Sequence, residues 1–383
     1  MINTVFKNEN KIKSLIKWPG GKQSELKVIK NNTPDTIKNY YEPFLGGGAV
    51  YFALNEDKVE NFFVNDISKE LMNFYNRIKI EDDNFINTLY SMDRAWTILQ
   101  KIVENNQERL LDIYKSYRSE CFSEDYLAAI LLQFVNDNLN HFKKSIEDSV
   151  NIETNKFISD MPNIIFKKIK RMKNIEIKKN SLLIDKDILD NIESAIKAGY
   201  YTHIRYLYNN FKKFDINNSI SGALFYFIRE YCYSSMFRYN ADGEFNVPYG
   251  GISYNRKNFK DKIKQLENQE LKEKFKKTEF ANCDFEEFFK DRKINKDDFI
   301  FLDPPYDTDF STYSNNEFIN EDHVRLANFC KSVKGKFMLV IKNTGFIYDL
   351  YKDFNISSFD KKYTVSFKNR NDRNVKHLMI KNY

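Results

Sequence analysis

The chain has 383 residues, of which 42% are hydrophobic and 30% are charged, so it is long enough for two or three domains and has the composition of a globular protein rather than a disordered one. It holds no apolar stretch as long as a membrane span, and its N-terminal residues lack a signal-peptide hydrophobic region, which makes the cytoplasm the expected location and argues against a membrane partner. The formal net charge of +6 is compatible with a nucleic-acid partner, although a bias toward Lys and Asn produces the same balance without one.

The first 80 residues predict the beginning of an α/β sheet. An apolar stretch starting at Tyr40 leads into Gly46–Gly48, and a helix is predicted from Ala49. The segment NFFVNDIS reads as a short strand that ends at Asp66, and KELMNFYNRIK has helical spacing. A carboxylate 20 residues beyond the first glycine of such a unit is the layout of a nucleoside-binding half-sheet.

The middle of the chain has a different pattern. Residues 81–221 are rich in Lys, Asn and Ile, mostly helical in spacing, and poor in Gly and Pro. A loop-like segment, EYCYSSMFRYNADGEFNVPYGG, follows, and then an amphipathic helix near Asp261–Lys277. Strands resume with TEFAN, FIFLDPPY, KFMLVIKN and the closing pair KYTVSFK and VKHLMIKNY. This order predicts one α/β sheet domain that is split by a large, mainly helical insertion.

The glycine loop carries the pattern FxGxG, formed by Phe44, Gly46 and Gly48. It lacks the GxGxxG of dinucleotide binders, and no lysine follows it as in a P-loop, so a nucleoside without a pyrophosphate is a better ligand than ATP or NAD. Asp66 is placed to accept two hydrogen bonds from a ribose diol. The alternative is that Asp66 caps the helix that begins just after it.

A second acid follows a later strand in the segment CDFEEF. Asp284 can accept a hydrogen bond from the exocyclic amine of an adenine, and the ring of Phe285 can pack against the base. The alternative is a helix-capping acid beside a core phenylalanine. The four cysteines and four histidines show no CxxC or HxxxH spacing, so neither a disulfide framework nor a metal site is expected.

The most specific signal is the strand Phe299–Leu302, which runs directly into Asp303-Pro304-Pro305-Tyr306. Prolines fix φ and remove N–H donors, so the acid is held in a rigid turn at the carboxyl end of a strand. The exocyclic amine of a base is a poor nucleophile, because its lone pair is delocalised into the ring. Hydrogen bonds to a carboxylate and to the Pro304 carbonyl would free that lone pair, while Tyr306 stacks on the base. The alternative is a helix-capping acid in a proline turn with Tyr306 in the core.

Five motifs resemble those of the Dam-type DNA adenine-N6 methyltransferases: KWPGGK (Lys17 to Lys22), EPFLGGGAV, NDIS, FRYNADGEFNVPYG and DPPY. The resemblance implies a Rossmann-like, mixed seven-stranded α/β sheet flanked by helices. It also implies transfer of the methyl group of S-adenosyl-L-methionine to N6 of an adenine flipped out of double-stranded DNA. The implied catalytic residues are Asp303, Pro304, Pro305 and Tyr306. The implied cofactor contacts are Trp18, Lys22, Phe44, Gly46, Gly48, Asp66, Asp284, Phe285 and Asp303.

The same resemblance implies DNA contacts in the loop-like segment. Tyr233 corresponds to an aromatic residue that inserts beside the flipped base, and Arg238 to an arginine that reads guanine edges, where a surface ion pair is the alternative. The remaining implied contacts, which hold the shape of the loop, are Asn240, Asn246 and Pro248. The chain carries Ser234-Ser235 where members that methylate GATC usually carry Asn-Gly, which argues against GATC as its target.

These observations predict a catalytic domain made of residues 1–80, which bind the cofactor, and residues 256–383, which carry the DPPY site. Residues 81–255 are the predicted helical insertion and target-recognition domain. Two basic stretches of it, Phe166–Lys179 and Tyr200–Lys213, are either phosphate contacts or solvated helices. A basic turn near the C-terminus adds two possible phosphate contacts, Arg370 and Arg373.

The predicted function is therefore a site-specific DNA adenine methyltransferase, cytoplasmic and nucleoid-associated. It would be the modification half of a restriction–modification system whose endonuclease is encoded separately. An N4-cytosine methyltransferase usually has Ser before the two prolines, and RNA or protein methyltransferases tend to have Asn there. A non-catalytic DNA-binding regulator on the same scaffold is a further alternative, but it would not need Lys22, Asp66, Asp303 and Tyr306 together.

Overall fold

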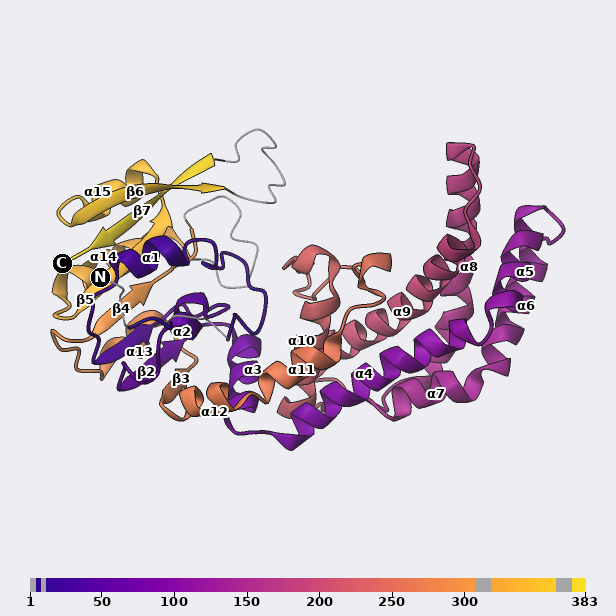
Figure 1. The fold of residues 1–383 in the computed structure, drawn as a ribbon, viewed down its shortest axis with the longest axis horizontal. Helices are drawn as coiled ribbons and strands as arrows, with labels where there is room; N and C mark the ends of the chain where they lie inside the picture. The colour runs from indigo at the N-terminus through magenta and orange to yellow at the C-terminus, as the bar shows by residue number, and fades with distance from the viewer. Residues whose placement is uncertain (1–4, 8–11, 307–317, 363–373) are drawn as a thin grey trace. The chain divides into compact units, whose positions relative to one another are not determined.

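The computed structural model describes residues 5–7, 12–306, 318–362 and 374–383. The chain divides into two compact units (Figure 1). The sheet unit comprises Met1–Ile80, Phe237–Gly243 and Gln265–Tyr383, and the helical unit comprises Glu81–Met236 and Glu244–Lys264. The short segment Phe237–Gly243 thus groups with the sheet unit, although it lies inside the stretch predicted as the insertion.

The sheet unit is built on a seven-stranded sheet with the order β3-β2-β1-β4-β5-β7-β6. β7 is antiparallel to both of its neighbours, and the other pairs are parallel. The predicted Rossmann-like mixed sheet with a helical insertion is confirmed. The strands are β1 (Asn39–Glu42), β2 (Asn61–Asn65), β3 (Thr278–Ala281), β4 (Phe299–Leu302), β5 (Lys336–Lys342), β6 (Asn355–Lys362) and β7 (Asn374–Lys381).

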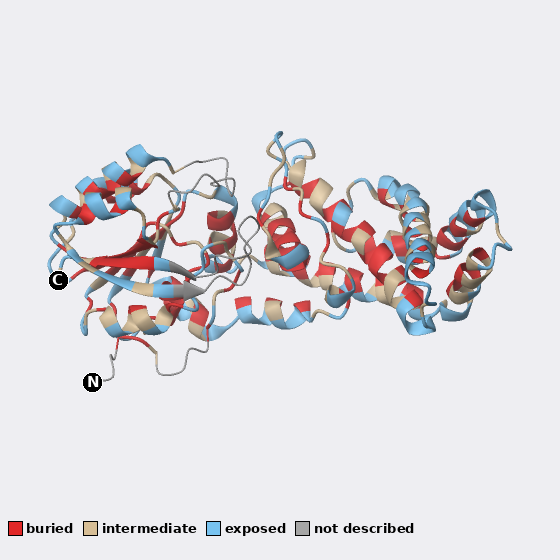
Figure 2. Cartoon of the chain, turned by 90° about the horizontal axis from the view of Figure 1, so that it is seen from above, coloured by how far each residue is buried: buried red, intermediate tan, exposed pale blue. Residues whose placement is uncertain are grey.

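Two layers of helices cover the sheet, because side chains of consecutive strand residues point to opposite faces. On one face, Tyr41 and Ile300 share a buried cluster with residues of α13, α14 and α15. On the other face, Tyr40 packs on Phe62, which contacts the ring of Tyr51 in α2. Figure 2 shows the buried residues concentrated in the strands and in the helix faces turned toward them. The helices of this unit are α1 (Leu26–Asn32), α2 (Ala49–Ala53), α3 (Lys69–Lys79), α12 (Gln269–Lys276), α13 (Phe285–Lys290), α14 (Asn320–Ser332) and α15 (Gly345–Tyr351).

Two sequence predictions differ from the structure. The single helix expected near Asp261–Lys277 is wrong, because two helices occupy this stretch. Asn268 separates them, since its side chain accepts from the backbone N–H groups of Glu270 and Leu271 and so begins α12. The expected strand KYTVSFK lies outside the described residues except for Lys362, and β6 is an edge strand that the sequence pattern did not predict.

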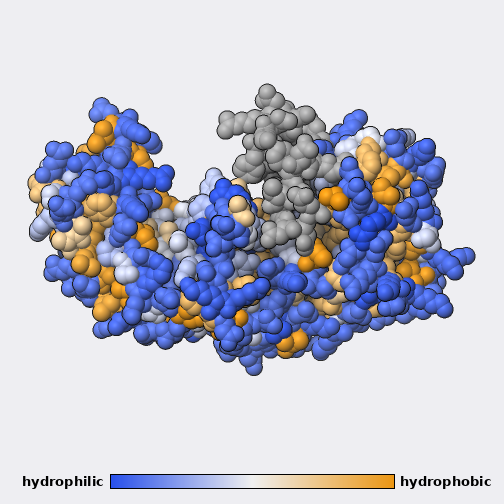
Figure 3. Space-filling view, turned by 180° about the vertical axis from the view of Figure 1, so that it is seen from behind, coloured by the Kyte–Doolittle hydropathy of each residue, from blue (hydrophilic) through white to orange (hydrophobic). Residues whose placement is uncertain are grey.

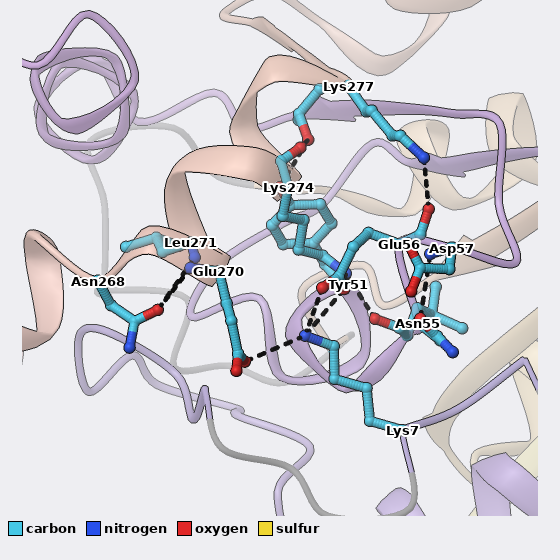
Figure 4. A network of polar contacts seen from close by, with 12 residues as sticks. Lys7, Tyr51, Asn55, Glu56, Asp57, Asn268, Glu270, Leu271, Lys274 and Lys277 are labelled. Atoms are coloured by element: carbon cyan, nitrogen blue, oxygen red, sulfur yellow. Dashed lines mark hydrogen bonds and ion pairs between the residues drawn. The ribbon is translucent and has the colours of Figure 1, made fainter.

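Helix α12 is attached to the sheet unit by a fully buried lysine, drawn in Figure 4. The Nζ of Lys274 donates to the Leu54 carbonyl at 2.6 Å and lies 4.3 Å from the centre of the Phe62 ring. The nearest carboxylate, that of Glu56, is 3.9 Å away and is also paired with Lys7 at 2.8 Å. Burial lowers the pKa of the Lys274 ammonium to about 7.

The helical unit encloses an aromatic core. Trp96 contacts the rings of Tyr200, Phe227, Tyr231 and Tyr249. Its helices are α4 (Asp83–Glu104), α5 (Gln107–Arg118), α6 (Glu124–Asp137), α7 (Leu139–Glu147), α8 (Thr154–Lys179), α9 (Asp185–Asn209), α10 (Asn218–Tyr231) and most of α11 (Phe259–Leu266), with the short 3₁₀ helices η1 (Tyr233–Ser235) and η2 (Ile252–Tyr254).

Hydrophilic residues cover most of the surface seen in Figure 3, and hydrophobic residues are exposed only in scattered groups. Among the described residues, no helix combines the length and the apolar composition that crossing a membrane requires.

Candidate active site

The carboxyl ends of β1 and β4 mark the candidate site. These two strands are neighbours, and the strand order runs in opposite directions from them. In open α/β sheets, ligands bind beside the strand ends at such a point of reversal. The glycine loop follows β1, and Asp303 follows β4, so the two strongest sequence signals meet at this edge of the sheet.

Lys22 joins the residues of the DPPY turn. Its side chain is 2% exposed, and its Nζ donates to Asp303 Oδ1 at 2.5 Å, to the Tyr306 hydroxyl at 3.0 Å and to the Gly20 carbonyl at 3.0 Å. An ammonium has three N–H groups, and these contacts use all of them. Asp303 caps no helix in the described part of the chain. The Tyr306 ring is partly buried and meets the ring of His377 edge-on.

Glu42 is a residue of this site that the sequence analysis missed. It is the last residue of β1 and is 3% exposed, and it accepts a hydrogen bond from the Tyr40 hydroxyl at 2.8 Å. Burial raises the pKa of its carboxyl group well above the ordinary value; the negative charge of Asp303 adds to the rise, and the ammonium of Lys22 opposes it. The signal was available, because Glu42, like Asp303, is an acid at the end of an apolar strand.

The glycine loop brings Trp18 against the strand ends. Gly46 and Gly48 have φ values of +49° and +65°, which favour glycine. A Cβ on Gly46 would lie 2.8 Å from Cδ1 of Trp18, so the indole packs directly on the backbone of the loop. Trp18 also meets the ring of Phe237 edge-on, with ring centres 4.7 Å apart. The loop is further held by the Tyr75 hydroxyl, which donates to the Gly46 carbonyl at 3.0 Å.

Asp66 faces the glycine loop rather than capping a helix. One carboxylate oxygen accepts from the Gly46 N–H at 2.8 Å and the other from the Ser68 N–H at 2.9 Å. The capping alternative is wrong, because Ser68 is the residue that caps α3. Burial raises the pKa of the Asp66 carboxyl to about 6. Each carboxylate oxygen can accept a further hydrogen bond.

Asn65, also missed from the sequence, ties together the ends of three strands. Its side-chain amide donates to the carbonyls of Pro43 and Cys283, and its oxygen accepts from the Cys283 N–H, each at 3.0 Å. Pro43 follows β1 and Cys283 follows β3. The buried amide thereby fixes the spacing between the glycine loop and the segment that carries Asp284.

Asp284 caps α13, as the alternative prediction stated, and its side chain accepts from the Glu286 N–H at 2.9 Å. It also accepts from Arg325 at 2.6 Å, and the guanidinium lies 4.9 Å from the centre of the Phe285 ring. Phe285 is 3% exposed, and the Phe44 ring lies beside it with centres 5.7 Å apart. The structure thus brings Phe44, Asp284 and Phe285 together next to the strand ends.

The predicted DNA contacts fall into both units. Tyr233 in η1 is 51% exposed, and its backbone N–H donates to the Pro248 carbonyl at 2.8 Å in the helical unit. Arg238 is exposed, and the side chain of Asn240 accepts from the Asp242 N–H at 3.1 Å, both in the sheet unit. Asn246 and Pro248 belong to the helical unit, whereas Arg370 and Arg373 lie outside the described residues.

Ser234 and Ser235, the pair that departs from Asn-Gly, both adopt the left-handed conformation, with φ of +51° and +52°. Residues with a Cβ adopt it at a cost of roughly 1–2 kcal/mol each, and Asn and Gly are the residues that enter it most readily. The backbone here therefore has the shape for which Asn-Gly is suited, and the two serines adopt it under strain.

Comparison with known proteins agrees with this arrangement. The family described as D12 class N6 adenine-specific DNA methyltransferase matches residues 18–127 and 145–365. The Type II methyltransferase M.CviBI of Paramecium bursaria Chlorella virus NC1A is 26% identical over 377 aligned residues, 97% of this chain and 100% of that protein. The Type II methyltransferase M.MjaIII of Methanocaldococcus jannaschii is 25% identical, with 97% and 99% covered. The DNA adenine methylase of Haemophilus influenzae is 22% identical, with 86% and 78% covered.

The matched ranges include the glycine loop, Asp66, the Tyr233–Pro248 segment and the DPPY turn. They also include most of the helical unit, which shares the family's pattern. The family description names N6 of adenine in DNA, and the relatives are named Type II methyltransferases or a DNA adenine methylase. The cytosine, RNA and regulator alternatives therefore lose their support. The chain belongs to the D12 class N6 adenine-specific DNA methyltransferase family and is an adenine-specific DNA methyltransferase.

Proposed function

We propose that this enzyme transfers the methyl group of S-adenosyl-L-methionine to N6 of an adenine that is flipped out of double-stranded DNA. The observation that carries the proposal is the DPPY turn at the end of β4, with Asp303 and Tyr306 both bound to Lys22. The sheet unit would bind the cofactor and carry out the chemistry, and the helical unit would contribute target recognition.

The residues at the end of β1 suit a nucleoside that bears a sulfonium. The Asp66 carboxylate is buried and accepts from two backbone N–H groups, so the two hydroxyls of a ribose would add the hydrogen bonds that favour its ionised form. Gly46 exposes backbone beside it, and the Phe44 and Phe285 rings provide apolar surface for a base. Trp18, Lys22 and Gly48 would shape the same pocket, and Asp284 would accept from the adenine amine of the cofactor.

The DPPY turn suits an exocyclic amine. Asp303 and the Pro304 carbonyl would accept the two N–H groups of N6, drawing the nitrogen toward a tetrahedral shape and freeing its lone pair. S-adenosyl-L-methionine, when bound, would supply an electrophilic methyl carbon, with the N6–C bond forming as the C–S bond breaks. N6 then loses one proton, which leaves after methyl transfer, so Asp303 need not be a strong base. The prolines prevent both acceptors from relaxing away during the reaction.

The DNA would be held by the segment around η1. Tyr233 is half exposed and would fill the space beside the flipped base, while Arg238 would donate to a guanine edge. Asn240, Asn246 and Pro248 would keep this segment in shape. Two relatives are named Type II methyltransferases, which supports a place in a restriction–modification system with a separately encoded endonuclease. Such an enzyme would act in the cytoplasm, at the nucleoid.

The test is expression in a host that lacks adenine methylation, followed by sequencing of its genomic DNA with a method that reports modified bases. We expect N6-methyladenine at one recurrent short sequence, and none from the Asp303→Ala variant. Alanine removes both acceptor oxygens, and Asp303 follows the end of β4 rather than lying in the core, so the variant should keep the fold. Equal methylation by this variant would overturn the catalytic assignment, and methylcytosine in place of methyladenine would overturn the choice of base.

A further inference from the structure

The turn that carries Tyr233 is fixed on both sides by the backbone of the helical unit. Cys232 pairs with Tyr249 in an antiparallel bridge, and the Gly250 N–H donates to the Tyr231 carbonyl at 3.0 Å. Within the turn, the Met236 N–H donates to the Tyr233 carbonyl at 3.0 Å. Cys232 and Met236 are extended, so the change in chain direction depends on the residues between them.

The local sequence does not favour this turn. Ser234 and Ser235 are both left-handed, whereas serine has no special preference for that conformation. Their side chains are not buried, so core packing does not hold them there. A conformation that a sequence disfavours persists only where its surroundings impose it.

Arg229 supplies that constraint. It lies in α10, is 1% exposed, and donates through Nη1 to the Met236 carbonyl at 2.5 Å and through Nη2 to the Ser235 carbonyl at 3.0 Å. Its guanidinium also lies 6.0 Å from the centre of the Phe245 ring. A planar guanidinium is suited to two acceptors at once, which a lysine ammonium on a flexible stem is not. A cation is buried only where such acceptors are in place.

We propose that Arg229 is a positioning residue for target recognition: it holds the Ser234–Ser235 turn in its left-handed form and thereby sets how Tyr233 is presented to DNA. The inference rests on the proposed DNA-reading role of this segment. Arg229 itself is buried and has no need to touch DNA. In this chain Arg229 stabilises the left-handed turn, which an Asn-Gly pair at positions 234 and 235 would adopt through its own conformational preference.

The test is a mutant cycle between Arg229 and the two serines. Four proteins are compared: the wild type, Arg229→Met, the pair Ser234→Asn with Ser235→Gly, and the combination of all three. Methyl transfer is measured on a duplex with the preferred site and on duplexes with one altered base. Ile204→Ala, which opens a cavity in the core of the same unit, is the control for loss of stability alone.

We expect Arg229→Met to raise KM for DNA and to lower discrimination against altered sites by about tenfold, while kcat at saturating DNA changes little. In the Asn-Gly background the same substitution should cost about threefold or less, because the turn then forms on its own. Arg229→Lys should resemble Arg229→Met more than the wild type. Ile204→Ala should lower the melting temperature without changing discrimination.

Equal effects of Arg229→Met in both backgrounds would overturn the inference, as would an unchanged KM and discrimination in the single variant. The failure of the proposed function is a separate outcome: it would appear as an inactive wild-type protein that binds no DNA. Unchanged discrimination in an active wild type and an active Arg229→Met variant would count against the role of Arg229 alone.

Discussion

The substitution Asp66→Asn removes the negative charge of the Asp66 carboxylate and keeps nearly the same size and shape of the side chain. In the wild type, burial raises the pKa of Asp66 from 3.8 to about 6. Because the folded-state pKa is the higher one, the folded protein holds this proton more tightly than the unfolded chain. The resulting stability is present below pH 3.8 and is lost as the pH rises to about 6. Above that pH the folded protein carries the cost of a buried carboxylate.

The size of the effect follows from the shift. One pKa unit corresponds to about 1.4 kcal/mol, so the full difference is about 3 kcal/mol, and the part lost between about pH 5 and pH 7 is about 1.4 kcal/mol. Asparagine does not titrate, so the variant lacks this pH-dependent loss of stability. It also offers one acceptor oxygen where Asp66 offers two, and either the Gly46 or the Ser68 N–H then faces an amide NH₂, at a cost of roughly 1–3 kcal/mol. At neutral pH the two effects largely offset one another.

The affinity for S-adenosyl-L-methionine should depend on whether the Asp66 carboxylate is ionised. Ribose hydroxyls donate to the ionised carboxylate, so wild-type affinity should fall by up to about tenfold per pH unit below about pH 6. The Asp66→Asn variant should bind roughly 10- to 100-fold more weakly at about pH 7, since a hydrogen bond to a charged group contributes about 1.5–3 kcal/mol, and its affinity should not vary with pH through this residue. Isothermal titration calorimetry from about pH 5 to 8 measures both, with circular dichroism confirming the fold.

Ser68→Ala is the matched control for this experiment, because it removes the cap of α3 and keeps the Asp66 carboxylate. It should retain the pH dependence of the wild type. Wild-type affinity that stays constant across this pH range, together with tight binding by Asp66→Asn, would refute the assignment of Asp66 to the ribose.

Two further predictions concern basic residues. Lys274 has a folded-state pKa lowered by burial to about 7, so the unfolded chain binds more protons above this pH, and stability should rise from about pH 7 to 9 by about 2 kcal/mol through this residue. Lys274→Met should flatten the rise in urea unfolding; an identical rise in both proteins would contradict the burial argument. On α8, Lys167, Arg171 and Lys178 line a surface hollow of about 670 Å³ and have no ion pair among the described residues. Replacing all three by Gln should reduce the slope of DNA affinity against salt concentration, on logarithmic scales, by about 0.9 for each phosphate that these residues neutralise, and an unchanged slope would mean a solvated face. The control removes three ion-paired lysines of the same unit: Lys115, Lys156 and Lys186.

The sequence predicted the elements whose signals are local. The strand before Asp303 is a run of four β-favouring apolar residues that ends at two prolines, and the structure places β4 there. β6 was missed for a physical reason: it lies at the edge of the sheet and pairs on one side only, so NISSFDKK does not need a continuous apolar pattern. The Asn268 cap was likewise a local signal, but the apolar spacing on both sides of it favoured one uninterrupted helix.

Local patterns could not show the site contacts that join residues far apart in the chain. Asn65 contacts Cys283 across 218 positions, and Lys22 contacts Asp303 across 281. Without the fold, Asn65 reads only as a polar residue at a strand end beside Asp66. The resemblance to a family identified Lys22 by its motif. Asn65 lies in the NDIS motif but was given no role there, and Arg229 lies outside the motifs, so the roles of both needed the fold.

Glu42 is a second acid beside the Lys22–Asp303 ion pair at the strand ends. Two carboxyl groups, those of Glu42 and Asp303, lie near the single ammonium of Lys22. Burial raises the pKa of Glu42 well above the ordinary value and so disfavours its charged form, whereas the ammonium of Lys22 pairs with Asp303 at 2.5 Å. Lys22 then fixes Asp303 through Oδ1, while an ionised carboxylate has about four acceptor positions and retains capacity for an amine.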